Sequence, residues 1–118
     1  MRIHITGRHV EITEALRDHV EQRVRSRLAE FPRLMDVHVV LMVEKHRHIA
    51  EIVVHVPHHG PVESRQESAD MYASIDAAAD HVAVQIRKWF ERRQAHKGKP
   101  TMADVAPDTG PALDGTTP

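Results

Sequence analysis

The sequence contains no cysteine, which excludes disulfide bonds, thiolate metal sites and a cysteine nucleophile. Chains without disulfides are typical of the cytoplasm, so we expect a cytoplasmic protein. The five glycines are isolated from one another and form no phosphate-cradling loop. Neither GxSxG nor HExxH occurs, and the carboxylates are scattered. We therefore expect no enzyme activity, no cofactor and no small-molecule substrate.

Long apolar runs and aromatic residues are also scarce. No stretch approaches the ~20 apolar residues of a membrane span, and no signal peptide is visible, so no membrane association is expected. The predicted strands carry no paired exposed aromatic residues on which single-stranded bases could stack. Any binding to RNA would therefore depend on backbone charge and on shape.

Hydrophobic periodicity predicts six secondary-structure elements. In order they are a strand at Arg2–Thr6, a helix from Glu14 to about Glu30, strands at Met35–Glu44, Ile49–Val56 and Val62–Glu67, and a long helix within Ser68–Lys97. Thr13 is the expected N-cap of the first helix, and Ser68 that of the second. Pro32 ends the first helix, while Gly98 and Pro100 end the second.

Apolar side chains recur at helical or alternating spacing, which predicts a single core. In the long helix the buried stripe comprises Met71, Ile75, Ala78, Ala79, Val82, Ile86 and Trp89. In the first helix it comprises Leu16, Val20, Val24, Leu28 and Phe31. In the second and third strands the inward residues are Val37, Val39, Leu41, Val43, Ala50, Ile52, Val54 and Val56.

The order β-α-β-β-β-α predicts an α+β fold, with a four-stranded mixed sheet and two helices packed on one face. A right-handed crossover makes the first two strands parallel, and hairpins reverse the next two. Both helices then run the same way along the sheet. We expect one domain at residues 1–97. Residues 98–118 are rich in proline, glycine and threonine and are expected to be a disordered tail.

Charge is distributed unevenly, although the net charge is only −1. Residues 87–99 hold six lysines or arginines and one glutamate, whereas residues 101–118 hold three aspartates and no base. The parallel helices predict a composite basic patch at one end of the domain, made of Arg23, Arg25, Arg27, Arg33, Arg87, Lys88, Arg92 and Arg93. A line of donors on the second helix, well suited to a polyanion, adds His81 and Gln85 to Lys88 and Arg92. The alternative is that these residues are solvated helix faces and partners of the helix dipoles.

The eleven histidines raise the possibility of a metal site. His4, His38 and His55 fall on the outward faces of three strands, where they are expected to be neighbours. Imidazoles alone can bind zinc or nickel. However, no acidic or thiolate partner stands at a ligand spacing, so only weak, adventitious metal binding is expected and no metal site is predicted.

Several runs of this sequence resemble the short ribosome hibernation promoting factors of bacteria, which are related to the ribosome-associated inhibitor protein Y. The runs are Ile5-Thr6-Gly7, Val10–Arg17, Val39–Leu41, Val43–Lys45, Asp70–Ala73 and Ile75-Asp76. The resemblance covers about residues 1–97. Family residues are matched best at Arg17, Arg23, Gln85 and Lys88. At His81 and Val84 the family more typically has basic residues, and the turn Pro57–Pro61 is one residue longer than usual.

This resemblance implies the β-α-β-β-β-α fold and a non-enzymatic role in translation. Such proteins bind ribosomal RNA of the small subunit, in the channel for messenger and transfer RNA, and block translation in idle, stationary-phase or stressed cells. Short members act with ribosome modulation factor to pair ribosomes. Long members carry an additional dimerisation domain, for which residues 101–118 are too few and too polar. The RNA-binding residues expected here are Arg17, Arg23, Arg25, Arg27, Arg33, His81, Gln85, Arg87, Lys88, Arg92 and Arg93.

Two other functions remain open from the sequence. The first is a general double-stranded-RNA-binding domain, which would bind naked duplex RNA as well as ribosomes. The second is a histidine-based protein that binds a metal or senses pH.

Overall fold

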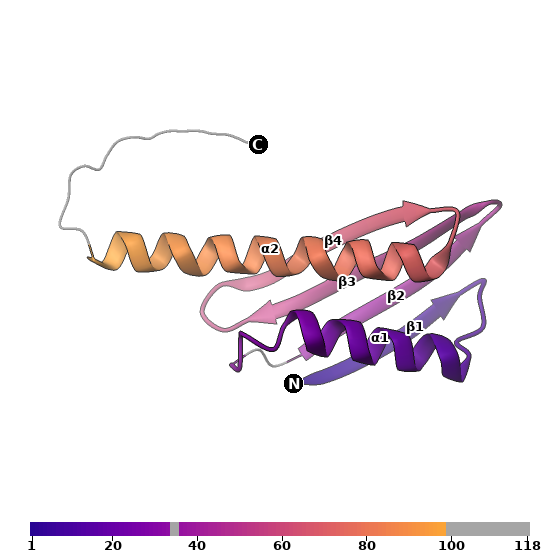
Figure 1. The fold of residues 1–118 in the computed structure, drawn as a ribbon, viewed down its shortest axis with the longest axis horizontal. Helices are drawn as coiled ribbons and strands as arrows, with labels where there is room; N and C mark the ends of the chain where they lie inside the picture. Colours follow the sequence, from indigo (N-terminus) through magenta and orange to yellow (C-terminus); the bar gives the residue numbers. More distant parts are fainter. Residues whose placement is uncertain (34–35, 99–118) are drawn as a thin grey trace. The chain divides into compact units, whose positions relative to one another are not determined.

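The computed structural model describes residues 1–33 and 36–98 (Figure 1). Its elements are β1 (Arg2–Arg8), α1 (Glu14–Arg27), β2 (Asp36–Glu44), β3 (Arg47–Val56), β4 (Gly60–Ser68) and α2 (Met71–Gly98). This order confirms the predicted β-α-β-β-β-α fold. The chain forms two compact units, Met1–Ile86 and Arg87–Pro118, so the boundary falls within α2. Except for Gly98, the predicted tail at residues 98–118 lies outside the described residues.

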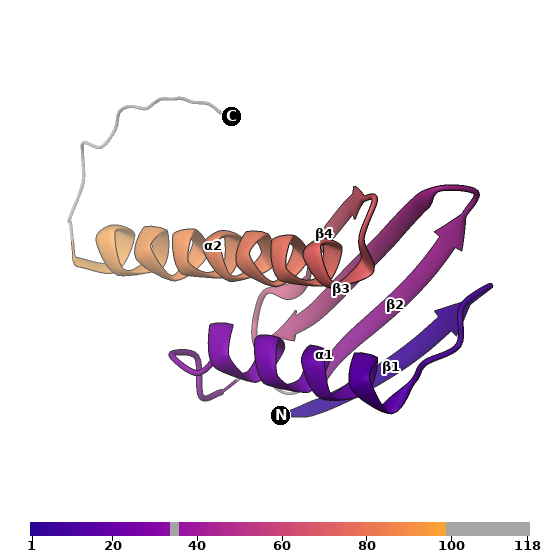
Figure 2. The same cartoon turned by 45° about the vertical axis from the view of Figure 1, so that its right-hand side comes forward.

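The four strands form one mixed sheet in the order β1-β2-β3-β4. β1 and β2 are parallel, and both hairpins, β2–β3 and β3–β4, are antiparallel. In the first unit, α1 and the first part of α2 lie on the same face of this sheet (Figures 1 and 2). This α+β arrangement, with its mixed sheet, is the one predicted.

Local hydrogen bonds explain where each helix begins. The side chain of Thr13 accepts a hydrogen bond from the Leu16 amide, which confirms Thr13 as the N-cap of α1. The prediction for α2 was wrong by two residues. Asp70, rather than Ser68, caps α2, because its carboxylate accepts a hydrogen bond from the Ala73 amide. The Ser68 hydroxyl instead hydrogen bonds to the backbone of Asp70 and so fixes the capping residue.

The core of the first unit lies between the sheet and the helices. Its largest fully buried side chains there are Val20, Val24, Leu28, Val37, Val39, Leu41, Ile52, Val54, Ile75, Val82 and Ile86. Val43, predicted to face inward, is only half-buried near the end of β2. Ile49 was not predicted to be in the core. It lies on the outer face of the sheet, paired in register with Met42 and Glu67, and is fully buried.

Gly7 lies where β1 approaches the loop that leads to α1. A Cβ atom at this position would lie 2.5 Å from the Val10 carbonyl oxygen and 2.9 Å from the Ile12 side chain. The close approach therefore requires glycine, and β1 continues beyond it to Arg8.

Candidate nucleic-acid interface

Ion pairs join α1 to α2 within the first unit. Arg23 Nε lies 3.0 Å from Asp76 Oδ1, and Arg27 Nε contacts Asp80 Oδ1. His19 Nε2 lies 2.8 Å from the same oxygen of Asp76. The contacts follow the same order along both helices. Up to Ile86, α1 and α2 therefore run in the same direction, as predicted.

Two predicted RNA-binding residues of α1 are thus held by carboxylates that sequence reasoning did not include in the site. A signal was present in the sequence. Arg23 and Arg27 are four residues apart, and so are Asp76 and Asp80. Parallel helices with matching four-residue spacings can form two equivalent pairs. A favourable interaction with the N-terminal dipole of α2 explains the positions of these aspartates equally well. For that reason the sequence did not predict their ion pairs with arginines.

The other predicted arginines of the first unit differ in their contacts. Arg25 Nε donates to Glu21 Oε1 at 2.9 Å, and its guanidinium also reaches the Met1 carbonyl oxygen at 3.5 Å. Arg17 and Arg33 are exposed, and neither side chain pairs with any residue in the described ranges. These two side chains are available to a polyanion without exchanging a protein partner.

His81 and Gln85 lie together on α2, as their four-residue spacing predicted. Gln85 Nε2 is 3.1 Å from His81 Nε2. His81 is exposed, yet its Nδ1 lies 2.9 Å from Ser64 Oγ on the helix-facing side of β4. Ser64 is buried. His81 therefore links α2 to β4 in addition to presenting a ring edge to solvent, a role that the sequence alone did not show.

The described part of the second unit continues α2 with a basic surface of its own. Arg87, Lys88 and Arg92 are exposed. Trp89 and Phe90 form an edge-to-face pair with ring centroids 4.8 Å apart. Trp89 is half-buried, so the prediction that it belongs to the fully buried stripe was wrong. The side chain of Arg93 lies outside the described residues.

Three histidines form a row across the outer face of the sheet, as predicted from strand alternation. His4 and His38 are directly paired in the parallel register, and their rings stack with centroids 4.7 Å apart. The His55 ring meets His38 edge-on at 5.7 Å. Across residues 1–33 and 36–98, no group of three or more potential ligands is arranged to hold a metal ion.

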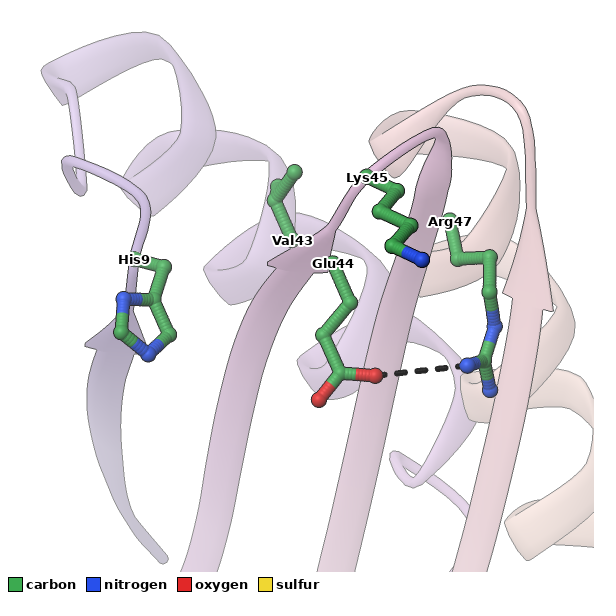
Figure 3. Close-up of a pocket in the computed structure, with 5 residues that line it drawn as sticks. All are labelled: His9, Val43, Glu44, Lys45 and Arg47. Atoms are coloured by element: carbon green, nitrogen blue, oxygen red, sulfur yellow. Dashed lines mark hydrogen bonds and ion pairs between the residues drawn. The ribbon is translucent and has the colours of Figure 1, made fainter.

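A separate hollow of about 480 Å³ lies near the β2–β3 turn, lined by His9, Val43, Glu44, Lys45 and Arg47 (Figure 3). Glu44 and Arg47 form an ion pair across it at 3.3 Å. Within the sheet this turn is at the end where α1 and α2 begin (Figure 1). Most of the predicted RNA-binding residues come later along the two helices, whereas Arg17 is in the first turn of α1 and Arg33 follows α1. None of them lines this hollow.

Comparisons with known proteins cover almost all of the described chain. Residues 3–94 match the family described as sigma 54 modulation protein / S30EA ribosomal protein. The ribosome hibernation promoting factor of Escherichia coli K12 is 40% identical over 96 residues, which cover 81% of this chain and 100% of that protein. The factor of the same name from Pseudomonas putida is 37% identical over 95 residues, which cover 80% of this chain and 92% of that protein.

Solved structures share the fold as well. A ribosomal subunit interface protein from Coxiella burnetii has a TM-score of 0.72 and 25% identity, covering 77% of this chain and 99% of that one. The N-terminal domain of protein Y from Thermus thermophilus has a TM-score of 0.69 and 37% identity, and the match covers 75% of this chain and 99% of that one. Nearly the whole of each of these structures has its counterpart in this chain.

Proposed function

This chain belongs to the family of sigma 54 modulation proteins and S30EA ribosomal proteins, and from this premise we propose that it inactivates ribosomes by occupying the small subunit. The family is one of ribosome-associated hibernation factors, not of enzymes. The match to the Escherichia coli factor over that protein's full length carries the proposal. The ribosome is accordingly the partner, and the cytoplasm is the proposed location.

The proposed mechanism is occlusion of the channel for messenger and transfer RNA. A folded domain placed there excludes both RNAs sterically and needs no chemical step. Exposed cations on the helices, among them Arg17, Lys88 and Arg92, supply contacts to ribosomal phosphates. Each neutralised phosphate releases counterions, so affinity is expected to fall steeply as salt increases. Ribosome modulation factor is the proposed second partner in pairing ribosomes.

The distribution of charged residues along the sequence supports a local contact with RNA, and not one spread over the whole domain. Acidic residues outnumber lysines and arginines in Met1–Ile86, whereas bases predominate in residues 87–99. A domain that bound RNA through uniform positive charge would not show this contrast. Oriented binding, with the basic helix surfaces toward the phosphates, is therefore favoured.

Sedimentation with purified ribosomal subunits tests this function. The full chain is expected to co-migrate with the small subunit, to bind the large subunit more weakly, and to reduce binding of messenger and transfer RNA. Naked duplex RNA of matched length serves as the control for a general double-stranded-RNA binder. Equal affinity for the duplex and for the small subunit would refute the proposal in favour of that alternative.

A further inference from the structure

The ion pairs between α1 and α2 use one particular edge of each arginine. In both ion pairs the guanidinium nitrogen nearest the aspartate is Nε: Arg23 Nε lies 3.0 Å from Asp76 Oδ1, and Arg27 Nε contacts Asp80 Oδ1. A guanidinium has five N–H donors, one on Nε and four on the two terminal nitrogens. Each carboxylate thus lies beside the Nε atom of the guanidinium, on the side nearest the aliphatic part of the arginine.

The terminal nitrogens of both arginines remain available. They donate no hydrogen bond to any residue of the described chain. For Arg23 the Nε atom is buried and forms no hydrogen bond within the described chain, so its contact with Asp76 is an ion pair alone, whereas the side chain as a whole is 39% exposed. The terminal nitrogens of Arg23 are not among the buried polar atoms that lack a partner, and they therefore reach solvent. The side chain of Arg27 is 44% exposed.

Asp76 is itself held from a second direction. His19 Nε2 contacts the same Oδ1 atom at 2.8 Å, and the His19 ring packs edge-on against Tyr72 with centroids 4.9 Å apart. The carboxylate is thereby fixed between α1 and the start of α2. A fixed carboxylate restricts the rotamers of the arginine that it binds, and a restricted arginine loses less entropy when it binds a ligand.

We propose that Asp76 and Asp80 are positioning residues, which hold Arg23 and Arg27 with their terminal nitrogens directed outward to bind RNA phosphates. The inference rests on the proposed function. The two terminal nitrogens of a guanidinium can each donate a hydrogen bond to one of two phosphate oxygens. The aspartate leaves these terminal nitrogens free. The opposite interpretation is that the aspartates neutralise the arginines and compete with RNA. These two interpretations predict opposite signs for the effect of removing a carboxylate.

Charge-removing variants distinguish these interpretations. Simple electrostatics predicts that Asp76→Asn and Asp80→Asn bind the small subunit more tightly, because each removes a negative charge. Positioning predicts weaker binding, on the order of tenfold for the double variant. Positioning also predicts a shallower salt dependence, with a slope reduced by roughly 0.7 to 0.9 for each phosphate that the variant no longer neutralises.

Asp18→Asn is the matched control, since Asp18 is exposed on α1 and has no ion pair with a residue that the structure describes. This variant makes the same charge change and should bind equally well or slightly more tightly. If Asp76→Asn and Asp80→Asn behave like Asp18→Asn, the carboxylates do not position the arginines for RNA and the proposal is overturned.

A second pair of variants separates positioning from folding. Arg27→Lys keeps the charge but replaces the fork with a single ammonium group, which cannot present two separate edges. We expect it to weaken binding with an unchanged melting temperature. Arg47→Lys, at an exposed arginine of β3 that is paired with Glu67 and is not among the predicted RNA-binding residues, should have little effect on binding. Equal effects of the two substitutions would contradict the proposal.

NMR of the free protein tests the positioning step independently of any ribosome. The Nε–H groups of Arg23 and Arg27 should be rigid in the wild type, with high heteronuclear NOE values, and mobile in the Asp→Asn variants. Mobile Nε–H groups in the wild type would overturn the inference while leaving the proposed function intact. If these Nε–H groups are rigid in the wild type but the wild type does not bind the small subunit, the proposed function is wrong and the positioning of the arginines is not.

Discussion

Ser64 Oγ and His81 Nδ1 lie 2.9 Å apart and link β4 to α2. A hydroxyl can donate to a neutral imidazole nitrogen and can accept from a protonated one, so this bond is compatible with both charge states of His81. The Gln85 amide, 3.1 Å from the other ring nitrogen, can likewise present its nitrogen or, after a flip, its oxygen. The geometry therefore allows His81 to gain a proton without losing its partners.

Ribosome affinity is accordingly expected to rise as the pH falls from about 7.5 to 6, the range in which histidines change charge. Phosphate favours the protonated imidazole, so binding and protonation reinforce each other. His81→Lys should bind tightly at both pH values and flatten the dependence, as measured by titration at fixed ionic strength. Its melting temperature must also be compared with that of the wild type, because Ser64 loses its imidazole partner.

His46→Lys is the control for this experiment. His46 is exposed in the β2–β3 turn and is not on α2. It should leave the pH dependence unchanged. A wild-type slope of zero, or one that survives in His81→Lys, would show that His81 does not contribute.

Replacing both Lys88 and Arg92 with glutamate should abolish ribosome binding without unfolding the protein, because both side chains are exposed. Removing two cations that neutralise phosphates should reduce the slope of log affinity against log salt by about 2. Circular dichroism and co-sedimentation are the measurements. Arg8→Glu combined with Lys45→Glu makes the same charge change at other exposed sites. Equal reductions of affinity in the two double variants would mean that net charge, and not the helix surface, governs binding.

Ile86→Ala should destabilise the fold more than Trp89→Ala does. Ile86 is completely buried, and truncation of such a residue costs about 2–5 kcal/mol. Trp89 is half-buried, so its truncation should cost less than the roughly 3–5 kcal/mol of a core tryptophan. Urea unfolding of the two variants gives the comparison. A larger decrease in stability for Trp89→Ala would place the tryptophan in the core after all.

Arg47 and Glu67 join β3 to β4 through two hydrogen bonds, of 2.8 and 3.1 Å. The hydrogen bond from Arg47 lowers the pKa of Glu67 below its ordinary value. A lowered pKa means that the folded state favours the ionised carboxylate. The resulting stability is present above the ordinary glutamate pKa of about 4.3 and is lost as the pH falls through the lowered value.

Glu67→Gln should therefore be less stable than the wild type at neutral pH, and the difference should disappear in acid. Thermal melts at pH values from about 7 to 2 test this expectation. Glu63→Gln, on the same exposed side of β4 and without an ion pair to a described residue, provides the control. If the difference in melting temperature between Glu67→Gln and wild type stays constant with pH, the ion pair of Glu67 with Arg47 does not contribute the pH-dependent stability.

The sequence by itself determined the element order, the strand directions and most of the core. These features depend on local periodicity and on short connections, both of which are written in adjacent residues. Strand alternation even placed His4, His38 and His55 on neighbouring strands of one face, where the His4 and His38 rings stack and the His55 ring meets His38 edge-on. The domain boundary after residue 97 stays a prediction, and so does the RNA-binding set.

Tertiary structure alone decided the partners of the side chains. Local pattern could not choose between Ser68 and Asp70 as a cap, because both residue types cap helices. Nor could it show that Arg23 and Arg27 meet Asp76 and Asp80, or that His81 reaches Ser64. Periodicity fixes which side of a helix is buried. It leaves open the rotation and translation of one helix against another element, and it is these that bring particular polar atoms into contact.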